Sequence, residues 1–352
     1  MKIGITGTGS YLPKIVTKNS DFLNHRFLEP DGTEIDSPSA TIIEKFKAIT
    51  GIKERRYANP DYNTSDLGFF AAEKAIEDAG IDQEDIDYII FAHNFGDVTK
   101  DKIQGDTVPS LATRVKHLLK IKNPSCVAYD MLFGCPGWIE SVIHAKAFIQ
   151  SGMAKICLVI GGETLSRVID PHDRDSMIYA DGAGACILEA NQGEGEILNH
   201  ASLTYSHDEA YYLTLDKTYD KEGCADTRFI KMSGRKIYEF ACKHVPQALA
   251  DCLDKSSVEI DDIKKILIHQ ANEKMDEAII KRFFRIYNKE IPEGIMPMII
   301  QRMGNNSVAT VPILLDRILR GLVQNQSLNS GDEVIFASVG AGMNINTFVY
   351  RF

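Results

Sequence analysis

Two short sequence patterns occur once in each half of this 352-residue chain, at almost the same separation. An Asp-Ile pair followed by an apolar run at 85–91 recurs at 262–268, a separation of 177 residues. A Ser-Gly-x3-Ile-x4-Gly pattern at 151–161 recurs at 330–340, a separation of 179 residues. Because both pairs keep their order and half of the chain is 176 residues, they predict an internal duplication. We place the boundary in the polar, glycine-bearing stretch 191–195, which gives halves of residues 1–192 and 193–352.

Each half alternates apolar, strand-like runs with helical patterns. The predicted strands are Ile3–Thr6, Tyr88–Ala92, Ser125–Asp130, Lys155–Ile160, Ile266–His269 and Glu333–Ser338. The predicted helices are Thr64–Ala79, Trp138–Gln150, Gly234–Leu253 and Val308–Gln324. This alternation is typical of an α/β protein in which helices cover both faces of the sheets.

Composition narrows the range of partners. The net charge of −10 argues against nucleic acid as the main partner. No apolar run reaches the ~20 residues that a membrane-spanning helix needs. The seven cysteines are odd in number, most lie in apolar runs and none forms a CxxC pair, so we expect a reduced, cytoplasmic protein without a zinc site. They are Cys126, Cys135, Cys157, Cys186, Cys224, Cys242 and Cys252.

Cys135 differs from the other cysteines in its local sequence. It follows a predicted strand and a glycine turn, and Pro136 suits the first position of the helix that comes next. At a helix N-terminus, free amides and the helix dipole stabilise a thiolate and are expected to lower the pKa of the thiol. The alternative interpretation is a small residue at a crowded turn.

Two polar segments of the second half are predicted to meet Cys135. His269 ends an apolar strand, where α/β proteins place active sites, although a hydrogen-bonded core histidine is equally compatible with the pattern. Asn305 lies in a glycine loop before the helix predicted at 308–324, where it could also serve as a cap. The duplication would bring this helix start and that of Cys135 towards one centre. In such a site the cysteine would be the nucleophile, and the histidine and the asparagine would be two polar groups that orient the substrate and stabilise charge.

A dinucleotide-binding site is the competing interpretation of the N-terminus. Gly7-x-Gly9 follows the first predicted strand, as in a Rossmann turn. Leu12 occupies the place of the third glycine, and Pro13 follows instead of a helix. We therefore reject an oxidoreductase of this kind.

Over nearly its whole length the chain resembles the β-ketoacyl-acyl carrier protein synthase III group of the thiolase-like superfamily. The matching stretches are Gly7–Pro13, Thr50–Arg55, Asp170–Arg174, Asp181–Ala185, His269–Asn272, Gly304–Ser307 and Arg351–Phe352. The resemblance implies the thiolase-like fold, in which two duplicated α/β halves are related by a pseudo-two-fold axis and layered αβαβα. It also implies a homodimer in which a loop of one subunit closes the acyl tunnel of the other.

The resemblance assigns roles to individual residues. Cys135 matches the acylated nucleophile, and His269 and Asn305 match the pair that binds the thioester carbonyl of a malonyl-type extender during decarboxylation. The amides of Cys135 and Ala341 match the first oxyanion hole, although glycine is more usual at the latter position. Lys274 matches a basic position that docks the acyl carrier protein. The implied reaction is a decarboxylative Claisen condensation that requires no metal or redox cofactor.

Some positions depart from the family pattern. Lys45 and Ile49 stand where a tryptophan and an arginine often flank the adenine of coenzyme A, which favours a carrier-bound acyl donor. Val108 replaces a bulky aromatic residue that closes the acyl tunnel, which predicts a longer or different acyl chain. We take Val108, His93 and Val339 as candidates for the acyl pocket, although for His93 the pattern favours the alternative of a strand-end histidine bonded to the backbone.

We compare four functions that a protein with this resemblance could have. The first is a synthase III of fatty-acid initiation, and the second is a specialised relative that condenses longer or functionalised acyl units for a secondary product such as a dialkylresorcinol. The third is a scaffold that binds acyl carrier protein without turnover. A 3-hydroxy-3-methylglutaryl-coenzyme A synthase is excluded because 93–97 lacks the glutamate base of that enzyme.

Overall fold

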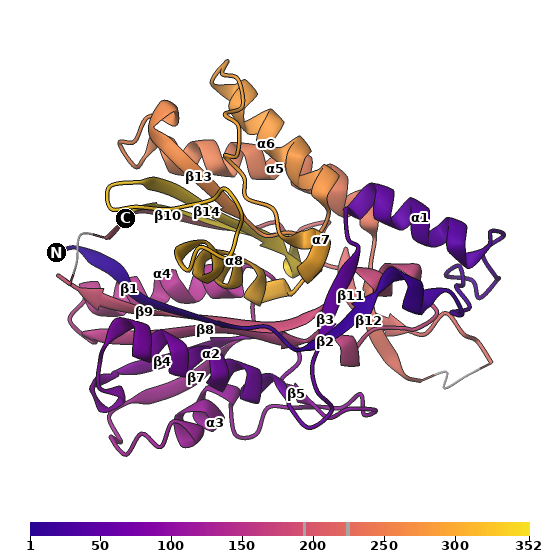
Figure 1. Ribbon diagram of the computed structural model, residues 1–352, viewed down its shortest axis with the longest axis horizontal. Helices are drawn as coiled ribbons and strands as arrows, with labels where there is room; N and C mark the ends of the chain where they lie inside the picture. Colours follow the sequence, from indigo (N-terminus) through magenta and orange to yellow (C-terminus); the bar gives the residue numbers. More distant parts are fainter. Residues whose placement is uncertain (193–194, 223–225) are drawn as a thin grey trace.

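In a computed structural model of the protein, two β-sheets are stacked with helices between and outside them. The structure describes residues 1–192, 195–222 and 226–352. Figure 1 shows the layers in order: helices below the first sheet, helices between the sheets and helices above the second sheet. This αβαβα layering is the arrangement that the resemblance predicted.

The first sheet has five strands in the order β1-β9-β8-β4-β7. Strands β8, β4 and β7 are parallel, whereas β9 runs antiparallel to both β8 and β1. The bounds are β1 Ile3–Tyr11, β9 Asp181–Ala190, β8 Ile156–Thr164, β4 Tyr88–Ala92 and β7 Val127–Met131. Because β7 pairs with β4 on one side only, it forms an edge of the sheet.

The second sheet repeats the order and the orientations of the first without the edge strand. Its order is β10-β15-β14-β13, with β13 and β14 parallel and β15 antiparallel to β14 and β10. The bounds are β10 Glu196–Thr204, β15 Asn344–Arg351, β14 Glu333–Gly340 and β13 Ile263–Ile268. Thus β13 and β14 occupy the places of β4 and β8, as the recurring sequence patterns require.

Helices α4 (Gly137–Gln150) and α8 (Thr310–Leu319) form the central layer. They share one hydrophobic core, to which Trp138 contributes from α4, Leu314 from α8, and Val159 and Phe336 from the two sheets. A helix buried on two sides must be apolar over most of its surface, which explains why α4 carries so few charged residues. This layer positions the helix starts that carry Cys135 and the Asn305 loop.

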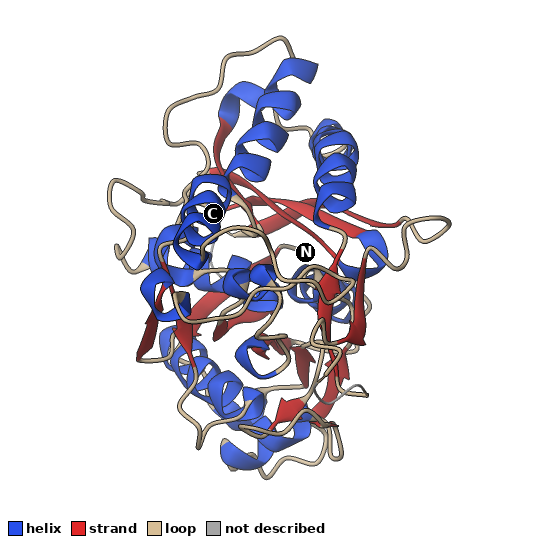
Figure 2. Cartoon of the chain, turned by 90° about the vertical axis from the view of Figure 1, so that its right-hand side faces the viewer, coloured by secondary structure: helices blue, strands red, loops and turns tan. Residues whose placement is uncertain are grey.

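The outer layers are formed by helices that bury one apolar face. On the first sheet they are α2 Thr64–Ala79 and α3 Leu111–Leu118, and on the second α5 Gly234–Asp254 and α6 Glu273–Ile286. Figure 2, turned by 90°, shows helices on both outer sides of the sheets. Helix α2 begins with a capping box between Asn63 and Asp66 and is followed by Gly80 in the left-handed region; the bounds Thr64–Ala79 are the predicted ones.

Shorter elements surround the ends of the strands where the site is expected. Hairpin β11–β12 consists of Leu213–Lys217 and Arg228–Met232, and helix α1 covers Ser39–Thr50. The others are β2 Ile15–Lys18, β3 Glu54–Tyr57, β5 Asp97–Val98, β6 Gly105–Asp106 and α7 Ile300–Met303.

The predicted elements are present, with shifted ends. The strand expected at 3–6 extends to Tyr11, and the helix expected at 308–324 starts with a 3₁₀ turn at Ser307–Ala309 and ends at Leu319. The expected boundary at 192/193 adjoins residues 193 and 194, which lie outside the described residues, as does Cys224. Over the described ranges, no helix is long and apolar enough to cross a membrane.

Candidate active site

Cys135, His269 and Asn305 line the same cavity, although they come from three distant parts of the chain. Cys135 precedes α4, His269 follows β13, and Asn305 lies between α7 and α8. The cavity has an empty volume of about 1000 Å³, including the part that is open to solvent. The structure therefore brings together the three residues that the sequence analysis grouped.

Close approach of two backbone turns fixes the position of Cys135. A Cβ atom built on Gly340, at the end of β14, would lie 2.6 Å from the amide nitrogen of Cys135. A side chain at position 340 would therefore displace the nucleophile loop. Ala341 follows in the same turn, and its backbone nitrogen lies close to Gly134, which precedes Cys135. The two amides expected to form the oxyanion hole are thus carried by adjoining turns.

The protonation of Cys135 differs from the sequence-based expectation. Burial raises the pKa of its thiol to about 11, and a hydrogen bond from Ser307 and the residue's own amide oppose this increase. The helix start was predicted to lower the pKa. The prediction was wrong because the sulfur faces a largely apolar cavity. There the free-energy cost of removing the thiolate from water is larger than the stabilisation that the nearby hydrogen-bond donors provide.

His269 is buried and neutral at physiological pH. Its backbone amide donates to the carbonyl of Ala337 at 2.9 Å, which continues the β13–β14 pairing beyond the end of β13. Burial lowers the pKa of its imidazole to about 4, and a hydrogen bond with the backbone of Ser307 opposes this decrease. Its Nδ1 atom has no hydrogen-bond partner within the described ranges.

Asn305 is held from both sides so that its amide nitrogen remains available. Its Oδ1 accepts from the amide of Ser307 at 2.7 Å. Its backbone exchanges hydrogen bonds with the segment around Tyr179, between Ile178 and Ala180. Gly304, with a φ of 64°, makes the turn that leads into Asn305, and a Cβ atom there would lie 2.9 Å from the side chain of Arg55. Among the residues that the structure describes, none bonds to Asn305 Nδ2, so this donor can serve a carbonyl in the cavity.

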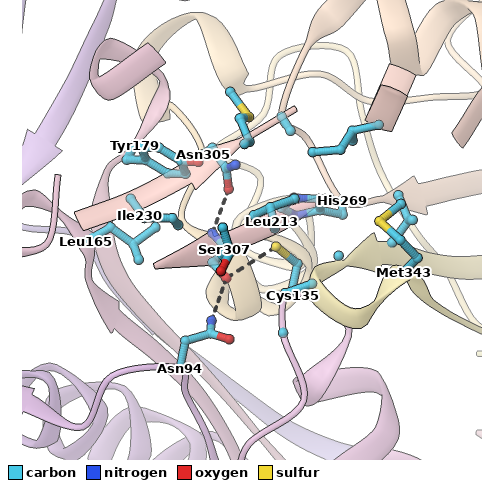
Figure 3. A pocket seen from close by; sticks show the side chains of 18 of the residues that line it. Asn94, Cys135, Leu165, Tyr179, Leu213, Ile230, His269, Asn305, Ser307 and Met343 are labelled. Carbon is cyan, nitrogen blue, oxygen red and sulfur yellow. Dashed lines mark hydrogen bonds between the residues drawn. The ribbon is translucent and has the colours of Figure 1, made fainter. Parts of the chain in front are cut away.

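Three polar residues behind the sulfur were given no role by the sequence analysis. Ser307 Oγ donates to Cys135 Sγ at 3.3 Å, and Asn94 Nδ2 donates to Ser307 Oγ at 3.0 Å (Figure 3). Asn94 Nδ2 also donates to a carboxylate oxygen of buried Glu163. Ser307 belongs to the Gly-Asn-x-Ser motif, which was the available signal. Asn94 and Glu163 lie at strand ends that only the tertiary structure brings together.

The rest of the cavity wall is largely apolar. Hairpin β11–β12 contributes Leu213, Leu215, Ile230 and Met232, and β14 contributes Val339, one of the three predicted pocket residues. Such a wall suits an acyl chain and the aliphatic part of a thioester better than a charged substrate.

Two predicted acyl-pocket residues, His93 and Val108, do not line this cavity. His93 is fully buried; its Nδ1 accepts from the amide of Gly96 at 3.0 Å, and its Nε2 lies 2.9 Å from Asp130. Asp130 also accepts from the first amides of α3, so His93 joins β4, β7 and α3. Val108 is 84% exposed in this chain. The backbone-bonded interpretation of His93 thus agrees with the geometry.

Lys274 is exposed at the start of α6, and its neighbour Met275 lines the cavity. Gly51, which ends α1, lies against Glu273 in the same turn of α6, so the helix that carries Lys45 and Ile49 adjoins this region. Both residues are exposed. Within the described ranges, no group of three or more His, Cys, Asp or Glu is placed to hold a metal ion.

Comparisons with known proteins agree with this architecture. Two family models match the chain: 3-oxoacyl-[acyl-carrier-protein (ACP)] synthase III at residues 129–206 and its C-terminal counterpart at residues 253–352. The chain is 32% identical over 353 residues to the β-ketoacyl-[acyl-carrier-protein] synthase III of Staphylococcus haemolyticus, covering 100% of this chain and 99% of the relative. It is also 32% identical to synthase III 1 of Vibrio vulnificus, covering 99% of each.

A solved structure shows the same fold. The crystal structure of 3-oxoacyl-[acyl-carrier-protein] synthase III from Aquifex aeolicus matches with a TM-score of 0.79 and 29% identity, covering 99% of this chain and 100% of that one. Fold and relatives together define the class: an acyltransferase among the thiolase-like condensing enzymes. Within that class, the chain belongs to the β-ketoacyl-acyl carrier protein synthase III family, and its activity is a condensation of the synthase III type.

Proposed function

We propose that Cys135 takes an acyl group from a carrier thioester and that the same cavity then condenses it with a malonyl-type carrier thioester. The observation on which this rests is the meeting of one thiol, one imidazole and one free carboxamide nitrogen in a single apolar cavity. A thiol in an apolar wall suits covalent storage of an acyl chain, and neutral donors suit a carbonyl that becomes negatively charged.

The first half-reaction is acyl transfer. The Cys135 sulfur attacks the thioester carbonyl, the amides of Cys135 and Ala341 donate to the resulting oxyanion, and the carrier thiolate leaves and takes up a proton. Because burial favours the protonated thiol, the thiol loses its proton during this step, and the departing carrier thiolate takes up a proton in its place. Ser307, which donates to the sulfur, stabilises the thiolate that forms.

The second half-reaction builds the new carbon–carbon bond. His269 and Asn305 donate hydrogen bonds to the thioester carbonyl of the extender while carbon dioxide leaves, and the electron pair of the broken bond forms an enolate. Its carbon attacks the acyl carbonyl on Cys135, and collapse of the tetrahedral intermediate returns the Cys135 thiolate. The thiolate then takes up a proton from solvent, and no step needs an oxidant or a reductant, so we propose that no resident cofactor or metal takes part.

An acyl carrier protein is the proposed donor and acceptor of thioesters. Lys274 lies exposed beside a cavity-lining residue and would pair with an acidic carrier, although the protein as a whole is negatively charged. Lys45 and Ile49 offer no aromatic or guanidinium surface for an adenine ring, which favours a carrier over coenzyme A. We also propose that the protein acts in the cytoplasm.

A homodimer is proposed around the free edge of the first sheet. Strand β7 has an unpaired edge, and the exposed apolar side chains beside it favour burial against a second copy. Val127 is 46% exposed at its start and Leu132 is 66% exposed just after its end. Pairing there would place the exposed Val108 loop near the partner's cavity, as the family resemblance implies.

Intact-mass spectrometry after incubation with acyl donors tests the assignment. We expect adducts of one acyl group on the wild-type protein and none on Cys135→Ala, with Cys126→Ala as the matched cysteine control. Acetyl transfer from a carrier or from coenzyme A would indicate fatty-acid initiation, and transfer of only longer carrier-bound chains would indicate the specialised relative. If no donor acylates the wild-type protein, Cys135 is not the nucleophile and a non-catalytic carrier-binding role replaces the proposal.

A further inference from the structure

A chain of hydrogen bonds leads from the sulfur of Cys135 into the first half of the protein. Ser307 Oγ donates to Cys135 Sγ at 3.3 Å and accepts from Asn94 Nδ2 at 3.0 Å. The same Asn94 nitrogen donates to Glu163 Oε1. Figure 3 shows Ser307 between Asn94 and Cys135. The two half-reactions described above use only the Ser307 end of this chain.

The donor and acceptor properties of these groups fix the direction of every link. Asn94 Nδ2 donates to Glu163 Oε1, an oxygen that can accept whether the carboxyl is ionised or, as its raised pKa favours at neutral pH, protonated on the other oxygen. That nitrogen carries a second hydrogen, which is directed to Ser307 Oγ. A hydroxyl that accepts from Asn94 keeps its own proton for a different acceptor, and the acceptor in reach is the Cys135 sulfur.

This chain of hydrogen bonds lowers the stability of the folded protein in two ways, so a role in packing does not explain it. Glu163 is 1% exposed in β8, and burial raises the pKa of its carboxyl to about 8, against hydrogen bonds from Asn94. Ser307 has a φ of 50°, in the left-handed region that non-glycine residues avoid. A buried acid and a strained serine in one chain of hydrogen bonds that ends at the sulfur indicate a functional arrangement.

We propose that Asn94 and Glu163 are positioning residues that hold the Ser307 hydroxyl towards Cys135 and thereby increase the fraction of reactive thiolate. This inference depends on the proposed role of Cys135 as the nucleophile. Asn94 reaches the sulfur only through Ser307, and Glu163 only through Asn94.

Three other groups affect the charge on the sulfur and must be separated from this effect. When its carboxyl is ionised, which its own raised pKa of about 8 limits at neutral pH, Glu163 raises the pKa of the Cys135 thiol and so opposes its orienting role. His269 and Tyr179 also line the cavity, and burial keeps the imidazole neutral and raises the pKa of the phenol. Replacing Glu163 by glutamine therefore has opposite predicted effects: less thiolate if orientation dominates, and more if charge dominates.

The test is alkylation of Cys135 by iodoacetamide in the full-length protein, measured over a pH series and localised by peptide mass spectrometry. Below the thiol pKa, the rate is proportional to the thiolate fraction. We expect Ser307→Ala to slow alkylation about tenfold at neutral pH, and Asn94→Ala and Glu163→Gln to slow it about threefold each. The matched control is Asn199→Ala, because Asn199 bonds to the carbonyl and sulfur of remote Cys252.

Two further measurements keep the result interpretable. Thermal denaturation identifies any variant that fails to fold, and the ultraviolet absorbance of the thiolate gives the same titration without a reagent. Unchanged alkylation in Ser307→Ala or Asn94→Ala, or faster alkylation in Glu163→Gln, overturns the proposal. Since alkylation needs no acyl donor, it is independent of whether Cys135 accepts acyl groups.

Discussion

At neutral pH the two principal side chains of the site, Cys135 and His269, are both uncharged. Burial raises the pKa of the thiol to about 11 and lowers that of the imidazole to about 4, so the ordinary order of the two values is kept and widened. A resting thiolate–imidazolium pair is therefore unfavourable here. The two residues therefore act in different steps. The sulfur of Cys135 is activated during acyl transfer, and the neutral His269 donates a hydrogen bond during decarboxylation.

Substitution of the two donors should separate the half-reactions. We expect His269→Ala and Asn305→Ala each to slow decarboxylation of a malonyl thioester by about 10²- to 10³-fold, the usual cost of removing one oxyanion donor. Acylation of Cys135, followed by intact mass, should persist because its oxyanion is bound by backbone amides. His144→Ala, which changes a partly exposed histidine of α4, serves as the control. Equal loss of both half-reactions would contradict this division.

The pH dependence of the two half-reactions should also differ. With Cys135→Ala as the background, decarboxylation should be constant from neutral pH down to about 5 and change only as the pH passes the pKa of His269, about 4, because the same neutral donor is present above that value. Acylation of the wild-type protein should instead rise with pH, up to about tenfold per unit below the thiol pKa. Stopped-flow measurements of each step provide the check. A decline in decarboxylation between pH about 7 and 6 would place His269 near its ordinary pKa of about 6.5.

Hairpin β11–β12 forms part of the cavity wall and is anchored by a buried ion cluster. Lys231 on β12 donates to Asp170 at 2.7 Å and to Asp173 at 3.0 Å, and its ammonium lies 3.2 Å from the centre of the Tyr219 ring. These charged groups are removed from water, so each depends on the others for its stability. The shape of the cavity thus depends on a contact outside it.

Lys231→Met should therefore destabilise the protein. Removing the cation leaves two buried carboxylates unpaired, and we expect the free energy of unfolding to fall by about 3–5 kcal/mol. Arg235→Met is the matched control, because Arg235 and Glu239 form an exposed pair at 2.9 Å whose loss should have little effect on stability. Chemical denaturation of both variants measures the difference. Similar values for the two would show that the buried cluster contributes nothing specific.

Elements with a strong local pattern were predictable from the sequence, and those defined by tertiary contacts were not. Helix α2 has its cap, its apolar face and its terminal glycine in the sequence, and its bounds were predicted without error. Strand β9 consists largely of small residues, so its pattern lacks the β-branched signal of β4, although it lies in the middle of the sheet. Likewise, Cys135, His269 and Asn305 follow from strand ends and helix starts, whereas Asn94 and Glu163 become neighbours only after folding.

At the scale of the whole molecule, the two halves differ in one respect that matters for assembly. The first sheet has a fifth strand, β7, which has no counterpart in the second sheet. That additional strand forms the exposed edge and also leads directly to Cys135. If two copies pair at this edge, the nucleophile loops of both subunits are supported by the same interface.

A charge on this edge should separate the subunits. We expect Val127→Lys to shift the protein from dimer to monomer at micromolar concentration, because a lysine on an edge strand opposes pairing with another strand. Leu322→Lys, at an exposed apolar residue after α8, should leave the dimer intact. Sedimentation velocity distinguishes the two species. A wild-type protein that sediments as a monomer would contradict the proposed assembly.

The left-handed backbone of Ser307 has a consequence for how this enzyme could be improved or damaged. Ser307→Gly would relieve that conformation, which is worth about 1 kcal/mol or more, but it would also remove the hydroxyl that accepts from Asn94 and donates to the sulfur. One Asn94 hydrogen would then lack its acceptor, at a cost of about 1–3 kcal/mol, so no net gain in heat resistance is expected. The strained backbone and the serine hydroxyl are therefore linked, and engineering that removes one also removes the other.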